Sequence, residues 1–374
     1  MSITQTLLRS RFAEALASPH SVDRYLEIVN PMWAAKEVRA RIVDIHREVD
    51  LPGVPPVATI TLQPTSTWRG HRAGQYVQLG LEVDGARRTT RCFSVSSPES
   101  GPGDRFTVTL RANPDAPDGR SVSRYLVERA RPGTIVHLSQ ADGEFTLPAQ
   151  VPDRVLFISG GSGITPVMSM LRTLQRRTHR GRVTFLHYAR SPHHQIYAAE
   201  LEQIRLAGYG VDLHLVYPEA GGPGAERLNR RRFTPMELER LVPGFRDVDT
   251  WACGPAGLIE KVRAAYSVDG QVSDKLRVEF FKTPVVSTGS AEGEVTFSRA
   301  GTTAANTGAT LLEQAEAAGL TPTFGCRMGI CFSCTATKSE GTVRNVLTGE
   351  TSSLPDEDIR ICVSAPEGDC AIDL

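Results

Sequence analysis

The sequence predicts a multi-domain fold of the β + α/β + α+β class, with an antiparallel barrel, a Rossmann-like parallel sheet and a small α+β domain. Short β-branched runs broken by glycine and proline fill residues 38–147. Apolar strands alternate with helical stretches over residues 153–276, and three cysteines lie within nine positions of a separate C-terminal segment. At 374 residues the chain also exceeds one typical hydrophobic core, which favours two or three domains.

The composition is that of a globular protein, with 40% hydrophobic and 22% charged residues. The formal net charge is zero, so nothing favours a polyanionic partner such as nucleic acid. No apolar run approaches the roughly 18 residues of a membrane span. The first twenty residues carry arginines within their apolar pattern and do not resemble a signal peptide. We therefore expect a cytoplasmic protein without a transmembrane segment.

The first 37 residues are predicted to form a helical extension. Apolar residues recur at helical spacing from residue 3 to residue 17, and the pattern stops at Ser18 and Pro19. This helix is expected to dock on the body of the protein, although such a stripe also suits a partner. A membrane-bound partner stays compatible with the sequence.

The barrel is predicted over residues 38–150. Its strands are expected in six runs, "VRARIVDIHRE", "VATITLQP", "GQYVQLGLEV", "TTRCFSVSS", "RFTVTLRA" and "TIVHLSQA". Several short strands separated by frequent turn residues are typical of a small antiparallel barrel.

The α/β domain is predicted over residues 151–281, because strands such as "RVLFISGG" and "RVTFLHYAR" alternate with helical stretches. This alternation indicates βαβ units and a parallel sheet. Residues 282–291 are rich in proline, serine and glycine, which predicts a linker. The remaining residues, 292–374, form the last domain.

A glycine-rich loop follows the first strand of the α/β domain. Gly160, Gly161 and Gly163 lie between a buried strand and a helix that opens near Thr165 and Pro166. Glycine lets the backbone approach a ligand, and a helix N-terminus attracts a diphosphate. An ordinary tight turn is the alternative, but the strand–loop–helix context favours a nucleotide site.

The second strand of this domain ends in Arg190, where a dinucleotide fold often has an acidic residue for the ribose 2′-hydroxyl. An arginine there favours a 2′-phosphate, and hence NADPH over NADH. The alternative is a solvated loop arginine. Arg231 and Arg232, in "LNRRRFT", are expected to share the phosphate.

The cysteine cluster has the spacing Cys326-x4-Cys331-x2-Cys334, with Cys362 following later. A zinc site usually pairs two C-x2-C units, and this chain has only one. The arrangement C-x4-C-x2-C…C is typical of a plant-type [2Fe–2S] site. Cys370 fits no ligand position and is expected to be structural.

Two further motifs, "RCFSVSS" at residues 91–97 and "GRSVSRYL" at residues 119–126, complete a resemblance. With the glycine loop and "WACGP" at residues 251–255, they make residues 38–281 similar to the ferredoxin–NADP reductase family. The resemblance implies an FAD-binding barrel and an NAD(P)-binding domain. Phe93 replaces the usual tyrosine of the first motif, and the second motif is one residue longer than usual.

The same resemblance assigns roles to residues. Arg91 is expected to pair with the FAD diphosphate, and Ser94 to bind near the flavin N5. The remaining expected cofactor contacts are Cys92, Phe93, Val122, Ser123, Cys253, Gly254 and Pro255, with Glu279 or Phe281 reaching the flavin. Ser94, Cys253 and Glu279 are the expected catalytic residues. The alternative for Cys253 is a small buried apolar residue.

Residues 292–374 resemble a plant-type ferredoxin, which implies a β-grasp domain. The three parts in this order imply that NADPH gives a hydride to FAD, which passes single electrons to the cluster. The expected acceptor is an oxygenase, a hydroxylase or a fatty-acyl desaturase. A reductase of a Rieske-type aromatic dioxygenase or a soluble monooxygenase stays open, as does a redox sensor without turnover.

Overall fold

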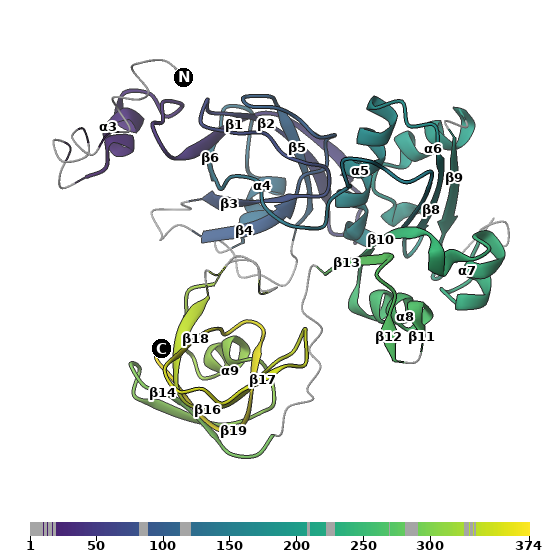
Figure 1. Ribbon diagram of the computed structural model, residues 1–374. Helices are drawn as coiled ribbons and strands as arrows, with labels where there is room; N and C mark the ends of the chain where they lie inside the picture. Colours follow the sequence, from purple (N-terminus) through teal and green to yellow (C-terminus); the bar gives the residue numbers. More distant parts are fainter. Residues whose placement is uncertain are drawn as a thin grey trace. The chain divides into compact units, whose positions relative to one another are not determined.

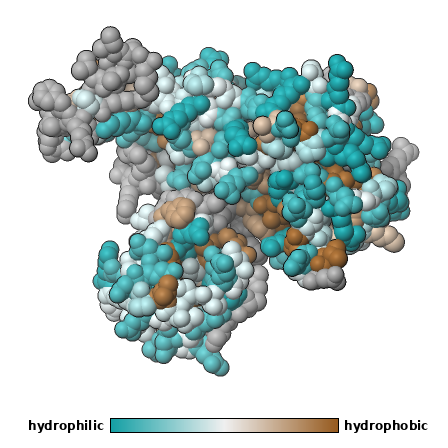
Figure 2. All heavy atoms as spheres, in the orientation of Figure 1, coloured by the Kyte–Doolittle hydropathy of each residue, from teal (hydrophilic) through white to brown (hydrophobic). Residues whose placement is uncertain are grey.

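The computed structural model describes Ser10, Ala13, Ala17 and residues 20–81, 89–112, 121–207, 210–221, 229–268, 270–280, 291–324, 329, 332 and 334–374. The chain divides into two compact units, Met1–Glu279 and Phe280–Leu374 (Figure 1). On the face drawn in Figure 2, hydrophilic residues cover much of both units. In the described ranges no helix combines the length and apolar character needed to cross a bilayer. The helix predicted over residues 3–17 lies almost entirely outside them.

The first unit contains a six-stranded antiparallel sheet in the order β4-β3-β6-β1-β2-β5. A bridge between Val95 and Val108 joins the two ends of this sheet, so the sheet closes into a barrel. Trp68 stacks on Phe106 at 4.7 Å inside the barrel core. All six predicted strands are present, and their bounds are Val38–Val49 (β1), Val57–Pro64 (β2), Tyr76–Leu81 (β3), Thr89–Ser94 (β4), Phe106–Arg111 (β5) and Ile135–Leu138 (β6).

Two helices accompany the barrel: α3 (Val22–Val29) in the N-terminal extension and α4 (Val122–Glu128) after β5. The sequence analysis did not predict α3, which begins after the capping residue Ser21. The buried carboxylate of Asp23 accepts hydrogen bonds from the backbone N–H groups of residues 35–37. Arg39 of β1, fully buried, donates to the carbonyl oxygens of Asp23, Pro31 and Trp33. These polar contacts fix the extension to the barrel.

The same unit contains a five-stranded sheet in the order β13-β10-β7-β8-β9. The strands β10, β7, β8 and β9 pair in parallel, as the βαβ pattern predicts. Its strands are Arg154–Gly160 (β7), Arg182–Tyr188 (β8), Val211–Val216 (β9), Asp249–Gly254 (β10) and Leu276–Phe280 (β13). Its helices are Ile164–Arg176 (α5), Ala198–Ala207 (α6), Pro235–Leu241 (α7) and Ala256–Tyr266 (α8). Short elements complete it: Gly161–Gly163 (η1), Pro192–His194 (η2), Phe245–Asp247 (η4), Ser267–Val268 (β11) and Gln271–Val272 (β12).

The second unit is a mixed sheet around one helix, with the strand order β15-β14-β19-β16-β17 and β18 beside β16. Its central strands β14 and β19 run parallel, and hairpins flank them, which is the β-grasp arrangement. Cys370 packs in this core, in agreement with a structural role. The element bounds are Glu294–Phe297 (β14), Thr302–Ala305 (β15), Leu311–Ala317 (α9), Thr335–Asn345 (β16), Thr351–Ser352 (β17), Glu357–Arg360 (β18) and Ser364–Ile372 (β19).

Candidate nucleotide, flavin and cluster sites

The glycine loop and the "WACGP" motif form one surface at the carboxyl edge of the parallel sheet. The strands β7 and β10 are neighbours, and Cys253 pairs with Ser159. A Cβ atom at Gly163 would lie 2.2 Å from the carbonyl oxygen of Cys253, and one at Gly160 would lie 2.9 Å from Pro255. Glycine is therefore required at both positions for the two motifs to pack together.

The start of α5 suits an anion. Gly163 precedes this helix and supplies no capping side chain, and the first turn carries no acidic residue. Pro166 lies in the first turn, where it sacrifices no intrahelical hydrogen bond. Thr165 donates its hydroxyl to the carbonyl of Ser162 at 3.0 Å. The first N–H groups of α5 and the positive end of its dipole thus face the loop without a competing carboxylate, which fits a bound diphosphate.

A thiol and a carboxyl group lie near each other at the same edge. Cys253 is fully buried on β10, and Glu279 lies on the neighbouring strand β13. Burial raises the pKa of Glu279 to about 8, and its Oε2 atom has no hydrogen-bond partner among the described residues. Burial, and then the charge of Glu279, raise the pKa of Cys253 well above its usual value. Near neutral pH both groups are mostly neutral, so Cys253 is not an activated nucleophile.

The strand β13 is not among the strands that the sequence predicts. Glu279 lies inside this strand, beside Cys253. Phe281, the other residue expected to reach the flavin, lies outside the described residues.

The flavin motif lies on β4. Ser94 is buried, and Phe93 packs partly against the barrel core. The guanidinium of Arg91 donates to the carbonyl of Thr90 at 2.8 Å. Cys92 is half-buried and lies between Arg91 and Phe93 in the chain. The motif therefore keeps one face of an aromatic ring partly accessible, with a cation and a hydroxyl on the same strand.

The second flavin motif opens α4. The side chain of Val122 is buried in the barrel core, so only its backbone can contact a ligand. Ser123 places its hydroxyl 3.2 Å from that of Ser121. Ser121, which the sequence analysis did not select, caps α4 by accepting from the N–H of Arg124. A serine directly before an apolar pattern of helical spacing is the sequence feature that could have identified Ser121 as the N-cap.

Basic side chains gather beyond the end of β8. Arg190 is exposed, and its carbonyl accepts from the N–H of Glu219 at 3.0 Å. Phe233 contacts the ring of Tyr188, which brings the neighbouring exposed Arg232 toward this end of the sheet. The sequence analysis missed Arg111 on β5, whose pKa is lowered by burial and by the charge of Arg190.

Neither guanidinium, of Arg111 or of Arg190, has a hydrogen-bond or ion-pair partner among the described residues. His194 lies in the same environment, because burial and the charges of Arg111 and Arg190 lower its pKa. The carboxylate of Glu219 has the opposite effect and raises the pKa of His194. Close cations with little compensating charge suit a phosphate group.

The cluster motif is described in part. Cys334 and Cys362 are buried, and the N–H of Ile361 donates to the carbonyl of Cys334 at 3.2 Å, which joins the two segments. The N–H of Gly329 donates to the sulfur of Cys362 at 3.3 Å. Such an N–H···S contact and buried cysteines fit an iron–sulfur cluster. Cys326 and Cys331 lie outside the described residues.

The cluster loop is clamped by Arg360. Its guanidinium donates to the carbonyl of Gly329 and lies 4.9 Å over the ring of Phe332, an exposed side chain. Gly329 has a φ of +72°, and a Cβ atom there would lie 2.8 Å from Val363. Glycine is thus required where the loop turns toward Cys362.

Two family models match the chain. Residues 157–264 match an oxidoreductase NAD-binding domain, and residues 295–367 match a 2Fe-2S iron-sulfur cluster binding domain. An NADPH oxidoreductase of Mycobacterium tuberculosis is 38% identical over 97% of this chain and 91% of that protein. A glycine betaine monooxygenase reductase subunit of Pseudomonas aeruginosa is 30% identical over 81% of this chain and 87% of that protein.

Among solved structures, phthalate dioxygenase reductase has a similar fold. The TM-score is 0.56 at 21% identity, over 90% of this chain and 97% of that chain. Barrel, parallel sheet and β-grasp domain occur here in the order that the sequence predicts. The chain belongs to the family of NAD(P)H-dependent oxidoreductases that join a ferredoxin–NADP reductase-type module to a C-terminal [2Fe–2S] ferredoxin domain.

Proposed function

We propose that this chain carries electrons from NADPH through FAD to its [2Fe–2S] cluster, and from the cluster to an oxygenase component. The strongest support is the convergence of the glycine loop, Cys253 and Glu279 at one edge of a sheet. That edge belongs to the same compact unit as the barrel with the flavin motif, and a separate unit holds Cys334 and Cys362 of the cluster motif.

Each predicted residue has a role in this proposal. FAD, when held by the barrel, would supply the chemistry that converts a two-electron hydride into single electrons for the cluster. Arg91 pairs with the FAD diphosphate, Phe93 offers its ring face, and Ser94 presents a hydroxyl to the flavin edge. Cys253 provides a small neutral surface for the nicotinamide, and Glu279 holds a proton beside it. The cluster ligands are Cys326, Cys331, Cys334 and Cys362.

In this proposal the nucleotide is bound at two places, the N-terminus of α5 and the basic side chains beyond the end of β8. Gly160, Gly161 and Gly163 admit the diphosphate to the N-terminus of α5. We assign the 2′-phosphate to Arg190, with Arg111 and Arg232 as further cations, because the guanidinium groups of Arg111 and Arg190 lack a carboxylate partner in the described ranges. The relative named NADPH oxidoreductase supports this choice over NADH.

An oxygenase acceptor is supported by the name of the glycine betaine monooxygenase reductase subunit, which the chain resembles over most of its length. The acceptor expected from the sequence also includes hydroxylases and fatty-acyl desaturases, which stay predictions.

Two measurements test the proposal. Purified protein should release FAD rather than FMN on denaturation, and NADPH should drive reduction of cytochrome c by way of the cluster. Co-purification with the native partner, followed by NADPH-driven turnover of that partner, then identifies the acceptor. A protein that binds both cofactors but reduces no acceptor with NADPH would instead be a redox sensor, and the proposed function would be wrong.

A further inference from the structure

A band of polar contacts joins the barrel to the α/β sheet within the first unit. We call it the lobe seam. On the barrel side it consists of residues 96–99, which continue the flavin strand β4. On the other side it consists of one face of α5, the helix that continues the glycine loop, together with its C-cap residue. These residues have the spacing i, i+3, i+4, i+7 and i+8: Ser169, Arg172, Thr173, Arg176 and the C-cap Arg177.

The inner part of the lobe seam is buried and hydrogen-bonded. The hydroxyl of Ser169 donates to the carbonyl of Ser97 at 2.6 Å. The hydroxyl of Thr173 accepts from the backbone N–H of Glu99 at 2.9 Å and donates to the carbonyl of Ser169 at 2.8 Å. Ser169 and Thr173 have no solvent-exposed surface. Because these partners are backbone groups, the contacts fix the path of the chain and not only of side chains.

Arg172 ties a third segment to the lobe seam. Its guanidinium donates to the carbonyl of Ser96 and forms a bidentate pair with Glu200 at 2.9 and 2.5 Å. It also lies 4.6 Å over the ring of Tyr197. The N–H of Tyr197 in turn donates to Glu48 of the barrel strand β1 at 3.2 Å. A guanidinium group with this many fixed partners, such as that of Arg172, has little freedom to move.

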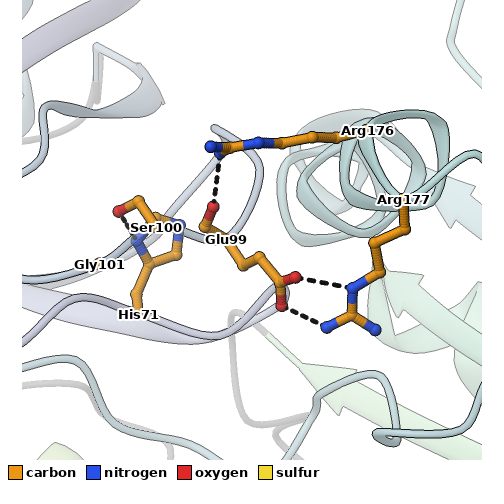
Figure 3. Close-up of a pocket in the computed structure, with 6 residues that line it drawn as sticks. All are labelled: His71, Glu99, Ser100, Gly101, Arg176 and Arg177. Carbon is orange, nitrogen blue, oxygen red and sulfur yellow. Dashed lines mark hydrogen bonds and ion pairs between the residues drawn. The ribbon is translucent and has the colours of Figure 1, made fainter.

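The outer part of the lobe seam lines an open cavity (Figure 3). Arg177 forms a bidentate pair with the carboxylate of Glu99, and Arg176 donates to the Glu99 carbonyl at 3.0 Å. His71, from the barrel, hydrogen-bonds to the hydroxyl of Ser100 at 3.0 Å. Both arginines already have partners here, so this cavity is better explained as part of the junction than as a ligand site.

We propose that Arg172 and Thr173 are positioning residues that set the separation between the flavin strand β4 and the nucleotide loop. This inference rests on the proposed binding of flavin at β4 and of nucleotide at the glycine loop. The contacts begin two residues after Ser94 and four residues after Thr165, about one helical turn. The lobe seam therefore connects the two motifs through a few residues and direct hydrogen bonds.

The expected effect is on the rate of reaction between the cofactors and not on their binding. A displacement of about 1 Å between reacting groups costs on the order of 100-fold in rate. Apart from Arg111 on the barrel strand β5, the nucleotide contacts lie within the α/β sheet and its loop, so nucleotide affinity depends less on the lobe seam. Arg172→Gln should lower flavin reduction at saturating NADPH by roughly 10- to 100-fold, with a change in nucleotide Kd of less than about threefold.

The test compares full-length holoprotein variants by stopped-flow absorbance, nucleotide titration and thermal unfolding. Arg205→Gln is the matched control, because Arg205 forms a similar bidentate pair with Glu202 at 2.8 and 2.6 Å on exposed α6. The long-wavelength band of nicotinamide stacked on flavin should weaken in Arg172→Gln and persist in Arg205→Gln. An unchanged reduction rate and band in Arg172→Gln, with only a lower Tm, would overturn the proposal.

Thr173→Val keeps the test decisive if Arg172→Gln does not fold. Valine keeps the shape of threonine but cannot accept from the N–H of Glu99, so hydrogen exchange at that amide should accelerate and flavin reduction should slow. Thr173→Ser should restore both, because it restores the hydroxyl. If the amide exchanges faster without any slowing of flavin reduction, the lobe seam does not position the cofactors. If wild-type protein itself fails to reduce flavin with NADPH, the proposed function is wrong instead.

Discussion

Cys253 and Glu279 are two ionisable side chains on neighbouring strands, and burial raises the pKa of both. In the proposed function both groups lie beside the nicotinamide, and their neutrality keeps an uncompensated negative charge out of a buried site. A neutral carboxyl can also hold or release a proton near its pKa of about 8. The sequence predicted a site role for both residues, Cys253 by the resemblance of "WACGP", but the raised pKa of Glu279 depends on neighbours that no local pattern reveals.

Glu279 should make the stability of the protein depend on pH. Its folded pKa of about 8 lies above the unfolded value, so its protonated form is favoured by folding. The contribution is complete below about pH 4.5 and is lost as the pH rises toward 8, at no more than about 1.4 kcal/mol per pH unit. Glu279→Gln should remove this dependence. Urea unfolding of both proteins at pH 5.5 and pH 8 measures it, and parallel pH profiles would refute the assignment.

Arg190 should decide the choice between NADPH and NADH. A charge-assisted contact to the 2′-phosphate contributes roughly 1.5–3 kcal/mol, so Arg190→Ala should raise the KM for NADPH by about 10- to 100-fold. The maximal rate should change little, since the 2′-phosphate is remote from the reacting carbon. The KM for NADH serves as the control and should stay constant. Arg111→Ala should act in the same direction if both cations meet the phosphate.

A wild-type preference for NADH, unaffected by either substitution, would show that the basic group beyond β8 has another role. Arg111 was not predicted because it lies on a strand of the barrel, about eighty residues from Arg190 in sequence. Only the packing of the two sheets in one unit brings these charges together.

At the scale of elements, the sequence predicted the strands of the barrel and the alternation of strands and helices well. Period-two and period-3.6 patterns are local properties, and most runs such as "VATITLQP" fold as their pattern indicates. Among the elements that the sequence did not predict are α3 and β13. The helix α3 is short and depends on contacts of Asp23 with residues 35–37, and β13 is a half-buried edge strand with no alternation.

The lobe seam could not be predicted from the sequence either, although its residues on α5 have regular helical spacing. Polar residues at helical spacing usually indicate a solvated face. Here Ser169 and Thr173 are fully buried against residues 96–99. Tertiary packing, and not the sequence pattern, decides which polar face is covered.

The helix α9 provides a test confined to one element. Thr310 and Glu313 form a reciprocal capping box at its N-terminus. Thr310→Ala should destabilise the ferredoxin unit by about 1 kcal/mol, whereas Thr310→Ser should retain most of the cap. The visible absorbance of the cluster during urea unfolding follows this unit separately from the flavin. Equal midpoints for the alanine and serine variants would show that the cap contributes little.

At the scale of the whole molecule, the division into two units predicts that the flavin and cluster functions separate. Cys331→Ser should abolish electron delivery to cytochrome c through the cluster, because a [2Fe–2S] site of this type needs four cysteine ligands. NADPH should still bleach the flavin at close to the wild-type rate. Stopped-flow absorbance at flavin and cluster wavelengths distinguishes the two steps. Loss of flavin bleaching in this variant would contradict independent modules.

The contacts that attach the N-terminal extension to the barrel determine where a chimera between related reductases should be joined. The sequence places a boundary between residues 37 and 38, at the start of β1. The guanidinium of Arg39 nevertheless depends on acceptors in residues 23–33, and Asp23 binds the chain that leads into β1. A chimera joined at residue 38 would separate these partners, whereas a junction before Ser21 would transfer the buried arginine together with the acceptors it needs.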